Sequence, residues 1–162
     1  MKSTITLISA AALLAACASS TSDKSAKTTH DTSPPSASRS VAASGSSATT
    51  LSGYKRDAAL HITGNNASKV YTGRPQALLR SVVVMKYTID AHGQVLRSEI
   101  IRSNHDGETE TIALHSLRSA APLPRPSSQL LRNGQLEVIE TWLFNDDGRF
   151  QLRTVAQPQM DS

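Results

Sequence analysis

The sequence has little cysteine and few aromatic residues, and both shortages limit what the chain can be. Cys17 is the single cysteine among 162 residues, which excludes an internal disulfide framework and a zinc site built from several cysteines. The aromatic residues are two Phe, three Tyr and one Trp, and all of them lie between Tyr54 and Phe150. This content predicts one compact domain of about a hundred residues.

The excess of positive over negative charge is also small. The formal net charge is +4, and residues 54–155 carry 13 Lys and Arg against 10 Asp and Glu. These charges are interspersed along the chain, whereas nucleic-acid binding needs a clustered basic surface. The sequence therefore predicts no nucleic-acid partner.

Large side chains are missing from the segment that precedes the domain. Ser, Thr and Ala make up 24 of the 36 residues from Ala18 to Gly53, and Val41 and Leu51 are the large aliphatic residues there. Such a segment buries too little surface to offset its chain entropy. We expect a disordered tether over residues 17–53, a folded domain over 54–155 and a tail over 156–162.

The amino terminus has the pattern of an export signal. Met1 and Lys2 are followed by an apolar run from Ile5 to Ala16, which is too short to span a bilayer. The run ends in Leu14-Ala15-Ala16-Cys17, which resembles the lipobox of bacterial lipoproteins. The resemblance implies that residues 1–16 are a cleaved signal peptide and that Cys17 carries fatty acyl chains such as palmitate. An ordinary secretory signal that contains a cysteine is the alternative.

The residue after the lipobox bears on location. Ala18 stands where proteobacterial lipoproteins retained at the inner membrane typically have Asp. The resemblance therefore favours the periplasmic side of the outer membrane, with lipid-anchored placement at the inner membrane as the less favoured alternative.

Sequence periodicity predicts a small α+β domain with an antiparallel sheet and two helices. A helical pattern covers 54–71, strand patterns cover 81–90 and 94–102 with turn residues between them, and a capped helical pattern covers 108–120. Further strand patterns follow at 136–144 and 150–155, joined by Asn145-Asp146-Asp147-Gly148. The predicted order is α-β-β-α-β-β.

Residue constellations for catalysis or metal binding are lacking in this domain. No two of its four histidines stand at the helical i, i+4 spacing of a zinc site. Ser116 and His115 are neighbours on a helix and point apart, and Glu137 and Glu140 fall on opposite faces of a strand. The sequence therefore predicts a protein that is not an enzyme and that needs no metal or cofactor.

A binding edge is the remaining candidate site. Edge strands of small sheets present unpaired backbone groups that extended peptides add to by β-augmentation. We expect an envelope protein or extended peptide to bind at the strand 136–144. The sequence leaves the oligomeric state open, with a homodimer as one option. One face of that strand carries the candidate partner-binding residues Leu136, Val138, Glu140, Trp142 and Phe144. Trp142 suits either a core or a partner contact.

The domain resembles the carboxy-terminal domain of TonB-family energy transducers, which TolA shares in outline. The resemblance runs from about Tyr54 to Leu152 and is densest over Val82 to Gly93, with the Ala113–Ala120 helix and Pro122-Leu123-Pro124 in the family's order. It implies the family's fold, with peptides of transporters adding to the third strand, which residues 136–144 match. In this chain, we expect the Asn145-to-Gly148 turn to fold residues 150–155 back onto that edge.

Together, these features predict a non-enzymatic periplasmic lipoprotein. Its TonB-like domain would bind an envelope protein or peptide, with a relation to TonB-dependent transport across the outer membrane. The alternative is a structural lipoprotein that supports envelope integrity without a defined ligand.

Overall fold

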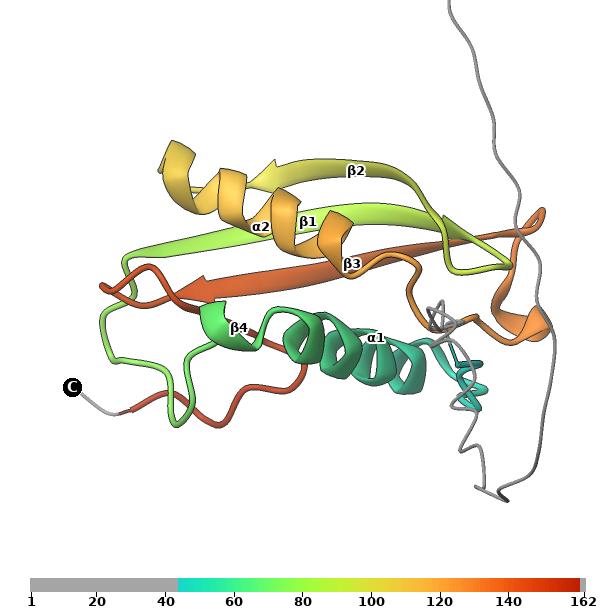
Figure 1. Ribbon diagram of the computed structural model, residues 1–162, viewed down its shortest axis with the longest axis horizontal. Helices are drawn as coiled ribbons and strands as arrows, with labels where there is room; N and C mark the ends of the chain where they lie inside the picture. Colours follow the sequence, from blue (N-terminus) through green and yellow to red (C-terminus); the bar gives the residue numbers. More distant parts are fainter. Residues whose placement is uncertain (1–43, 161–162) are drawn as a thin grey trace, which may run out of the picture. The chain divides into compact units, whose positions relative to one another are not determined.

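The computed structural model describes residues 44–160, which form an α+β domain (Figure 1). The expectations for residues 1–43, including Cys17, lie outside the described residues. The elements follow the predicted order, so the predicted fold class is confirmed. They are α1 (Leu51–Asn65), β1 (Ser81–Asp90), β2 (Val95–Arg102), α2 (Gly107–Ser119), β3 (Gln135–Phe144) and β4 (Phe150–Leu152), with short 3-10 helices at Ala67–Lys69 and Ser128–Leu130.

The four strands form one antiparallel sheet in the order β2-β1-β3-β4. β1 pairs with β3 over ten residues without a break, from Ser81 opposite Phe144 to Asp90 opposite Gln135. β1 is rich in β-branched residues, which pack well on a pleated surface between two neighbours. β4 pairs with only the last three residues of β3.

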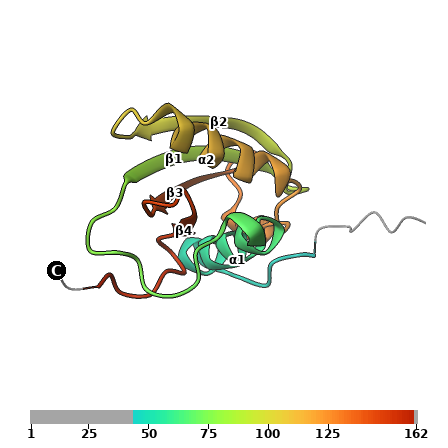
Figure 2. The ribbon, with the colours of Figure 1, turned by 60° about the vertical axis from the view of Figure 1, so that its left-hand side comes forward.

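Both helices cover the same face of the sheet, as two views show (Figure 1, Figure 2). Tyr54, Ala58 and Ile62 repeat along one face of α1, and they are buried in the same core as Ala113 and Leu117 of α2. Alternate residues of β1 and β3 complete this core, and they are Val83, Met85, Tyr87, Ile89, Leu136, Val138, Trp142 and Phe144. The other face of the sheet has no helix over it within residues 44–160.

Several predicted boundaries differ from the structure. The first helix begins at Leu51 rather than residue 54, because the Thr50 side chain caps it by accepting a hydrogen bond from Gly53 N. It ends at Asn65, within the predicted Gly64-Asn65-Asn66 interruption. Ahead of the helix, Ser46 N donates to Arg125 O over 2.9 Å, although the prediction placed this segment in the tether.

The last strand is shorter than predicted. Residues 150–155 have a strand pattern, but β4 ends at Leu152 because Val155 N and Ala156 N both donate to Leu152 O and close a turn. Within residues 44–160, no helix combines the length and the apolar character needed to cross a membrane.

Candidate functional site

The five residues predicted to meet a partner lie in the domain core. Leu136, Val138, Glu140, Trp142 and Phe144 are each at most 6% exposed. These even-numbered residues of β3 share the face that the helices cover, whereas alternate residues such as Glu137 and Ile139 face outward. A partner can therefore reach β3 through its backbone edge and its odd-numbered side chains.

Trp142 takes the first of its two predicted roles, that of a core residue. Its ring is fully buried, and its Nε1 donates a hydrogen bond to Ser116 Oγ of α2 over 2.9 Å. A buried indole N–H needs such an acceptor. The Trp142 side chain therefore fastens α2 to the sheet.

One end of the β3 edge is closed. β4 lies opposite Trp142, Leu143 and Phe144. The pairing continues on either side of β4, because Arg153 N donates to Thr141 O and Asn145 N donates to Arg149 O, both over 2.9 Å. The expected fold-back of the fourth strand therefore covers only this end of β3.

The middle of the β3 edge is open. Thr141 and Asn145 turn their backbone groups outward, so by alternation Glu137 and Ile139 do so as well. At the far end, Gln135 is closed by reciprocal hydrogen bonds with Arg132 of 2.7 and 3.0 Å. No described strand pairs with Glu137 or Ile139 on this side, and the Ile139 side chain is 44% exposed.

A hollow adjoins this open stretch. Its volume is about 460 Å³, and Leu136 and Glu137 of β3 line it together with Leu51, Leu130 and Arg132. Leu51 is 45% exposed. The hollow offers aliphatic walls with one charged group of each sign, next to backbone groups that a further strand would pair with.

The opposite edge of the sheet, β2, is less regular. Its register with β1 shifts between Val84 and Met85 and again between Thr88 and Ile89. β-Bulges of this kind bend an edge strand and oppose the addition of a long strand. The open stretch of β3 is therefore the better place for an extended peptide.

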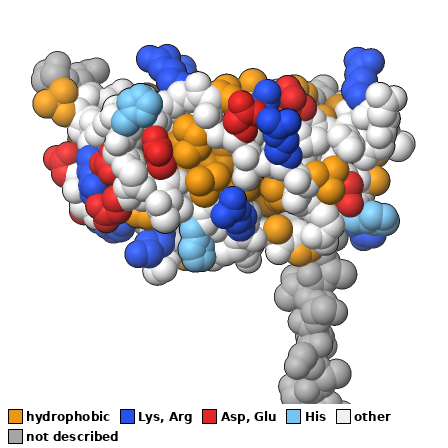
Figure 3. Space-filling model, turned by 90° about the horizontal axis from the view of Figure 1, so that it is seen from above, with side chains coloured by type: hydrophobic (Ala, Val, Ile, Leu, Met, Phe, Trp, Pro, Cys, Tyr) orange, Lys and Arg blue, Asp and Glu red, His pale blue; other side chains and the backbone are white. Residues whose placement is uncertain are grey.

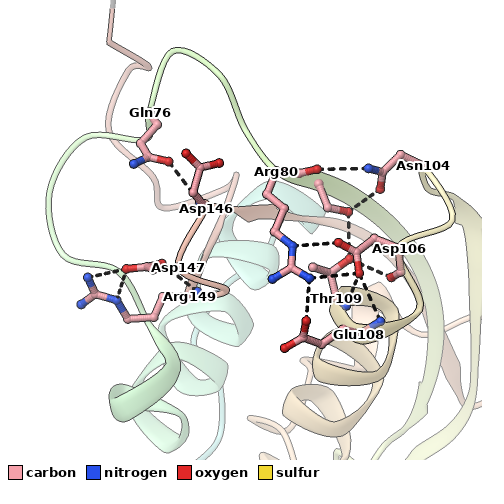
Figure 4. A network of polar contacts seen from close by, with 10 residues as sticks. Gln76, Arg80, Asn104, Asp106, Glu108, Thr109, Asp146, Asp147 and Arg149 are labelled. Atoms are coloured by element: carbon pink, nitrogen blue, oxygen red, sulfur yellow. Dashed lines mark hydrogen bonds and ion pairs between the residues drawn. The ribbon is translucent and has the colours of Figure 1, made fainter.

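The main polar cluster joins β1 to the start of α2 (Figure 4). Arg80 Nε lies 2.8 Å from Asp106 Oδ2, and Arg80 Nη2 lies 2.6 Å from Glu108 Oε2. Asp106 also caps α2 by accepting from Glu108 N and Thr109 N. Since Arg80 is paired with two carboxylates, we interpret the cluster as a fastening of β1 to α2 rather than a ligand site.

These hydrogen bonds change the pKa of Asp106. Partial burial alone would raise the pKa of Asp106, but the hydrogen bonds from Thr109 N and Arg80 outweigh it and lower the pKa below its usual range. The sequence predicted a capped helix but not the contact with Arg80, because Arg80 and Asp106 are 26 positions apart.

The described residues include no group of three or more His, Cys, Asp or Glu side chains placed to hold a metal ion. His61 bonds to the backbone, with Nε2 2.9 Å from Ala120 O. We find no arrangement in residues 44–160 that would activate a nucleophile.

Comparisons with known proteins give one relevant likeness. Over 71 residues, the chain is 25% identical to the protein TonB of Pseudomonas putida, and the match covers 44% of this chain and 29% of that protein. No family model matches the chain, and no solved structure matches it. The likeness indicates a TonB-like domain, as the resemblance predicted, and it covers less than a third of the relative.

Proposed function

We propose that this protein is a lipid-anchored envelope protein whose TonB-like domain binds an extended segment of another envelope protein. The partner segment would add to β3 as a further strand at Glu137 and Ile139. The observation that carries this proposal is the open middle of the β3 edge. It lies between Gln135, which pairs with Arg132, and Thr141, which accepts a hydrogen bond from Arg153.

The hollow beside this edge supports an extended peptide with a large aliphatic side chain. Side chains of an added strand alternate between the two faces of the sheet. One that falls on the helix-covered face beside Leu136 would reach the walls formed by Leu51 and Leu130. Backbone pairing would supply affinity, and this hollow would supply selectivity.

Membrane anchoring is the second part of the proposal. The Leu14-to-Cys17 motif supports cleavage before Cys17 and acylation of its thiol. More than one acyl chain is needed for stable anchoring. Ala18 supports placement on the periplasmic side of the outer membrane. Mass spectrometry of the membrane-bound protein should find Cys17 as an acylated amino-terminal residue, and an unmodified cysteine would contradict this part.

The binding proposal is tested by removing one edge donor. Ile139→Pro deletes the outward N–H without touching the bonds between β3 and β1, because the Ile139 backbone groups face away from β1. Ile139→Ser is the matched control, since it also shortens the side chain but keeps the N–H. In intact crosslinked cells, we expect Ile139→Pro to lose a partner that Ile139→Ser retains.

The control also separates binding from folding. Both variants should keep the far-ultraviolet circular dichroism spectrum and a cooperative thermal transition. If a folded Ile139→Pro protein recovers the same partners as Ile139→Ser, the β3 edge is not the binding site.

A role in transport is the finer form of this proposal. The TonB likeness supports a relation to transport across the outer membrane. A deletion strain would then take up siderophore or vitamin substrates more slowly. Detergent sensitivity with normal uptake would instead favour the structural alternative, a lipoprotein that supports the envelope without a defined ligand.

A further inference from the structure

We infer that the opposite edge of the sheet, β2, pairs with the β2 strand of a second copy of this chain. The pairing would be antiparallel, short and centred on Ser98. This inference is independent of the peptide-binding proposal, because it uses the other side of the sheet.

The backbone of β2 presents a short regular segment for such pairing. Asp90 N donates to Gln94 O over 3.1 Å, so Asp90 turns its backbone groups towards β2. By alternation, Thr88 and Lys86 do the same, towards Arg97 and Glu99. Ser98 and Ile100 therefore turn their N–H and C=O groups outward, where no described strand meets them.

The two register shifts decide which partner fits this segment. They fall beside Leu96 and Ile101 and leave only Arg97 to Ile100 in regular pairing with β1. A long peptide would meet a bulge at either end. A second copy needs only residues 97–99 of this segment, because a two-fold axis through Ser98 pairs Ser98 with its own counterpart and residue 97 of each copy with residue 99 of the other.

Charge complementarity fixes the centre of the pairing. A two-fold axis at Ser98 places Arg97 of each copy opposite Glu99 of the other, on the face of the sheet that lacks helices. Centring on Arg97 would oppose two arginines, and centring on Glu99 would oppose two glutamates. Like charges directly opposite on paired strands are destabilising, and opposite charges stabilise.

The groups at Arg97 and Glu99 are accessible for this contact. The Arg97 side chain is 75% exposed and the Glu99 side chain is 43% exposed. Within one copy, Glu99 lies 3.3 Å from Arg97 and 3.8 Å from Lys86. In the dimer, the same carboxylate would lie between cations of both copies.

Helix α2, which lies beside β2, also carries opposite charges at its two ends. Ser103, just after β2, donates a hydrogen bond to the Glu110 carboxylate, whereas Arg118 lines a hollow with residues 94–98 at the start of β2. An antiparallel pair brings the acidic end of one copy towards the basic end of the other.

Apolar surface accompanies these charges. Leu96 is 52% exposed and Ile101 is 44% exposed. Figure 3 looks down on the side of the domain where α2 and β2 lie, and it shows apolar side chains near the middle with charges of both signs around them. In the Ser98 register, Leu96 would lie opposite Ile100 of the second copy and cover part of this surface.

The first test is a disulfide between two copies. Opposite residues of a hydrogen-bonded antiparallel pair have Cα atoms about 5.5 Å apart, within the range of a disulfide. In the full chain under mild oxidation, Ser98→Cys should form a dimer. Arg102→Cys is the matched control, because two Arg102 residues would lie about 26 Å apart at about 3.3 Å per residue. The unmodified chain reports any linkage through Cys17.

The second test is a charge exchange, read by analytical ultracentrifugation of the full chain. Arg97→Glu and Glu99→Arg should each weaken the dimer about tenfold, and the double exchange should restore it. The inference is overturned if the unmodified chain stays monomeric, if Arg102→Cys links as readily as Ser98→Cys, or if all three charge variants associate equally.

Discussion

At the scale of single residues, Gly93 shows how one position fixes a connection. Its φ is +83°, and a Cβ atom there would lie 1.9 Å from Leu123 O. Leu123 N also donates to Gly93 O over 2.8 Å. The β1–β2 turn and the Pro122-Leu123-Pro124 segment therefore touch through backbone alone, which only glycine permits.

This contact gives a direct stability prediction. Gly93→Ala should lower the free energy of unfolding by about 3 kcal/mol or more, because the methyl group displaces backbone. Gly134→Ala is the matched control, since its φ is +76° but no heavy atom lies within 4 Å of the added Cβ. It should cost only about 1 to 2 kcal/mol. Urea unfolding of both variants measures the difference, and equal losses would contradict the contact.

Trp142 gives a second residue-scale prediction. Ser116→Ala removes the acceptor of its buried indole N–H, so we expect a loss of about 1 to 3 kcal/mol in unfolding free energy. His115→Ala, on the exposed side of the same helix, should change stability by less than about 0.5 kcal/mol. Denaturant unfolding followed by Trp142 fluorescence reports both, and an unchanged Ser116→Ala midpoint would argue against this bond.

At the scale of elements, sequence patterns predict individual strands and helices but miss contacts between residues far apart in the chain. The β1 strand follows from the alternation of its residues, and α2 follows from its helical periodicity and from the polar residues that cap its start. The end of β4 was missed because the turn at Leu152 involves no glycine or proline. The Arg80–Asp106 pair joins residues that only the folded sheet brings together.

For the candidate site, too, the sequence predicted the strand but not the features that depend on the folded sheet. The sequence predicted β3 as the binding strand, but its alternation alone could not tell which face the helices cover. In the structure, the even-numbered side chains enter the core, and the open stretch lies at Glu137 and Ile139. The extent of that stretch depends on the length of β4 and on the hydrogen bonds between Arg132 and Gln135, neither of which has a sequence signature.

The α2 cap predicts a defined response to acid. The pKa of Asp106 is lowered in the folded state by hydrogen bonds that outweigh partial burial, so its stabilising effect is complete above the ordinary Asp pKa of about 3.9. It is lost as pH falls through the lowered folded-state pKa.

Asp106→Asn should therefore flatten the fall of stability below about pH 4. Glu137→Gln, which alters an exposed carboxyl on β3, is the control. Thermal unfolding between neutral and acidic pH measures both slopes, and an unchanged slope in Asp106→Asn would contradict the assignment.

At the scale of the whole domain, long-range polar contacts hold the end of the chain. The Arg74 guanidinium donates to Pro158 O over 3.1 Å and to Gln159 O over 2.8 Å, and Met160 N donates to Pro75 O over 3.0 Å. The predicted tail over residues 156–162 therefore contacts, up to Met160, the segment that precedes β1.

Arg74→Ala should release this segment. We expect amide hydrogen exchange at Met160 to become about tenfold faster or more, while exchange in β1 and β3 stays unchanged. Arg56→Ala, an exposed cation on α1, should leave Met160 protected. Unchanged protection of Met160 in Arg74→Ala would show that other contacts hold the tail.

The two edges of the sheet have distinct roles in the proposed assembly. Pairing through β2 would leave both β3 edges free at the outer margins of a continuous eight-stranded sheet, since each copy contributes four strands. A dimer of this kind could hold two partner segments at once, which raises avidity without a new contact.

Site-specific photocrosslinking in intact cells tests the central claim most directly. A photoreactive residue at Glu137, on the open stretch of β3, should give a crosslink to one specific envelope protein. The same probe at Thr111, on the exposed side of α2, should not. The Glu137 crosslink should disappear with Ile139→Pro and persist with Ile139→Ser. A crosslink that survives Ile139→Pro, or one no stronger at Glu137 than at Thr111, would contradict binding at the β3 edge.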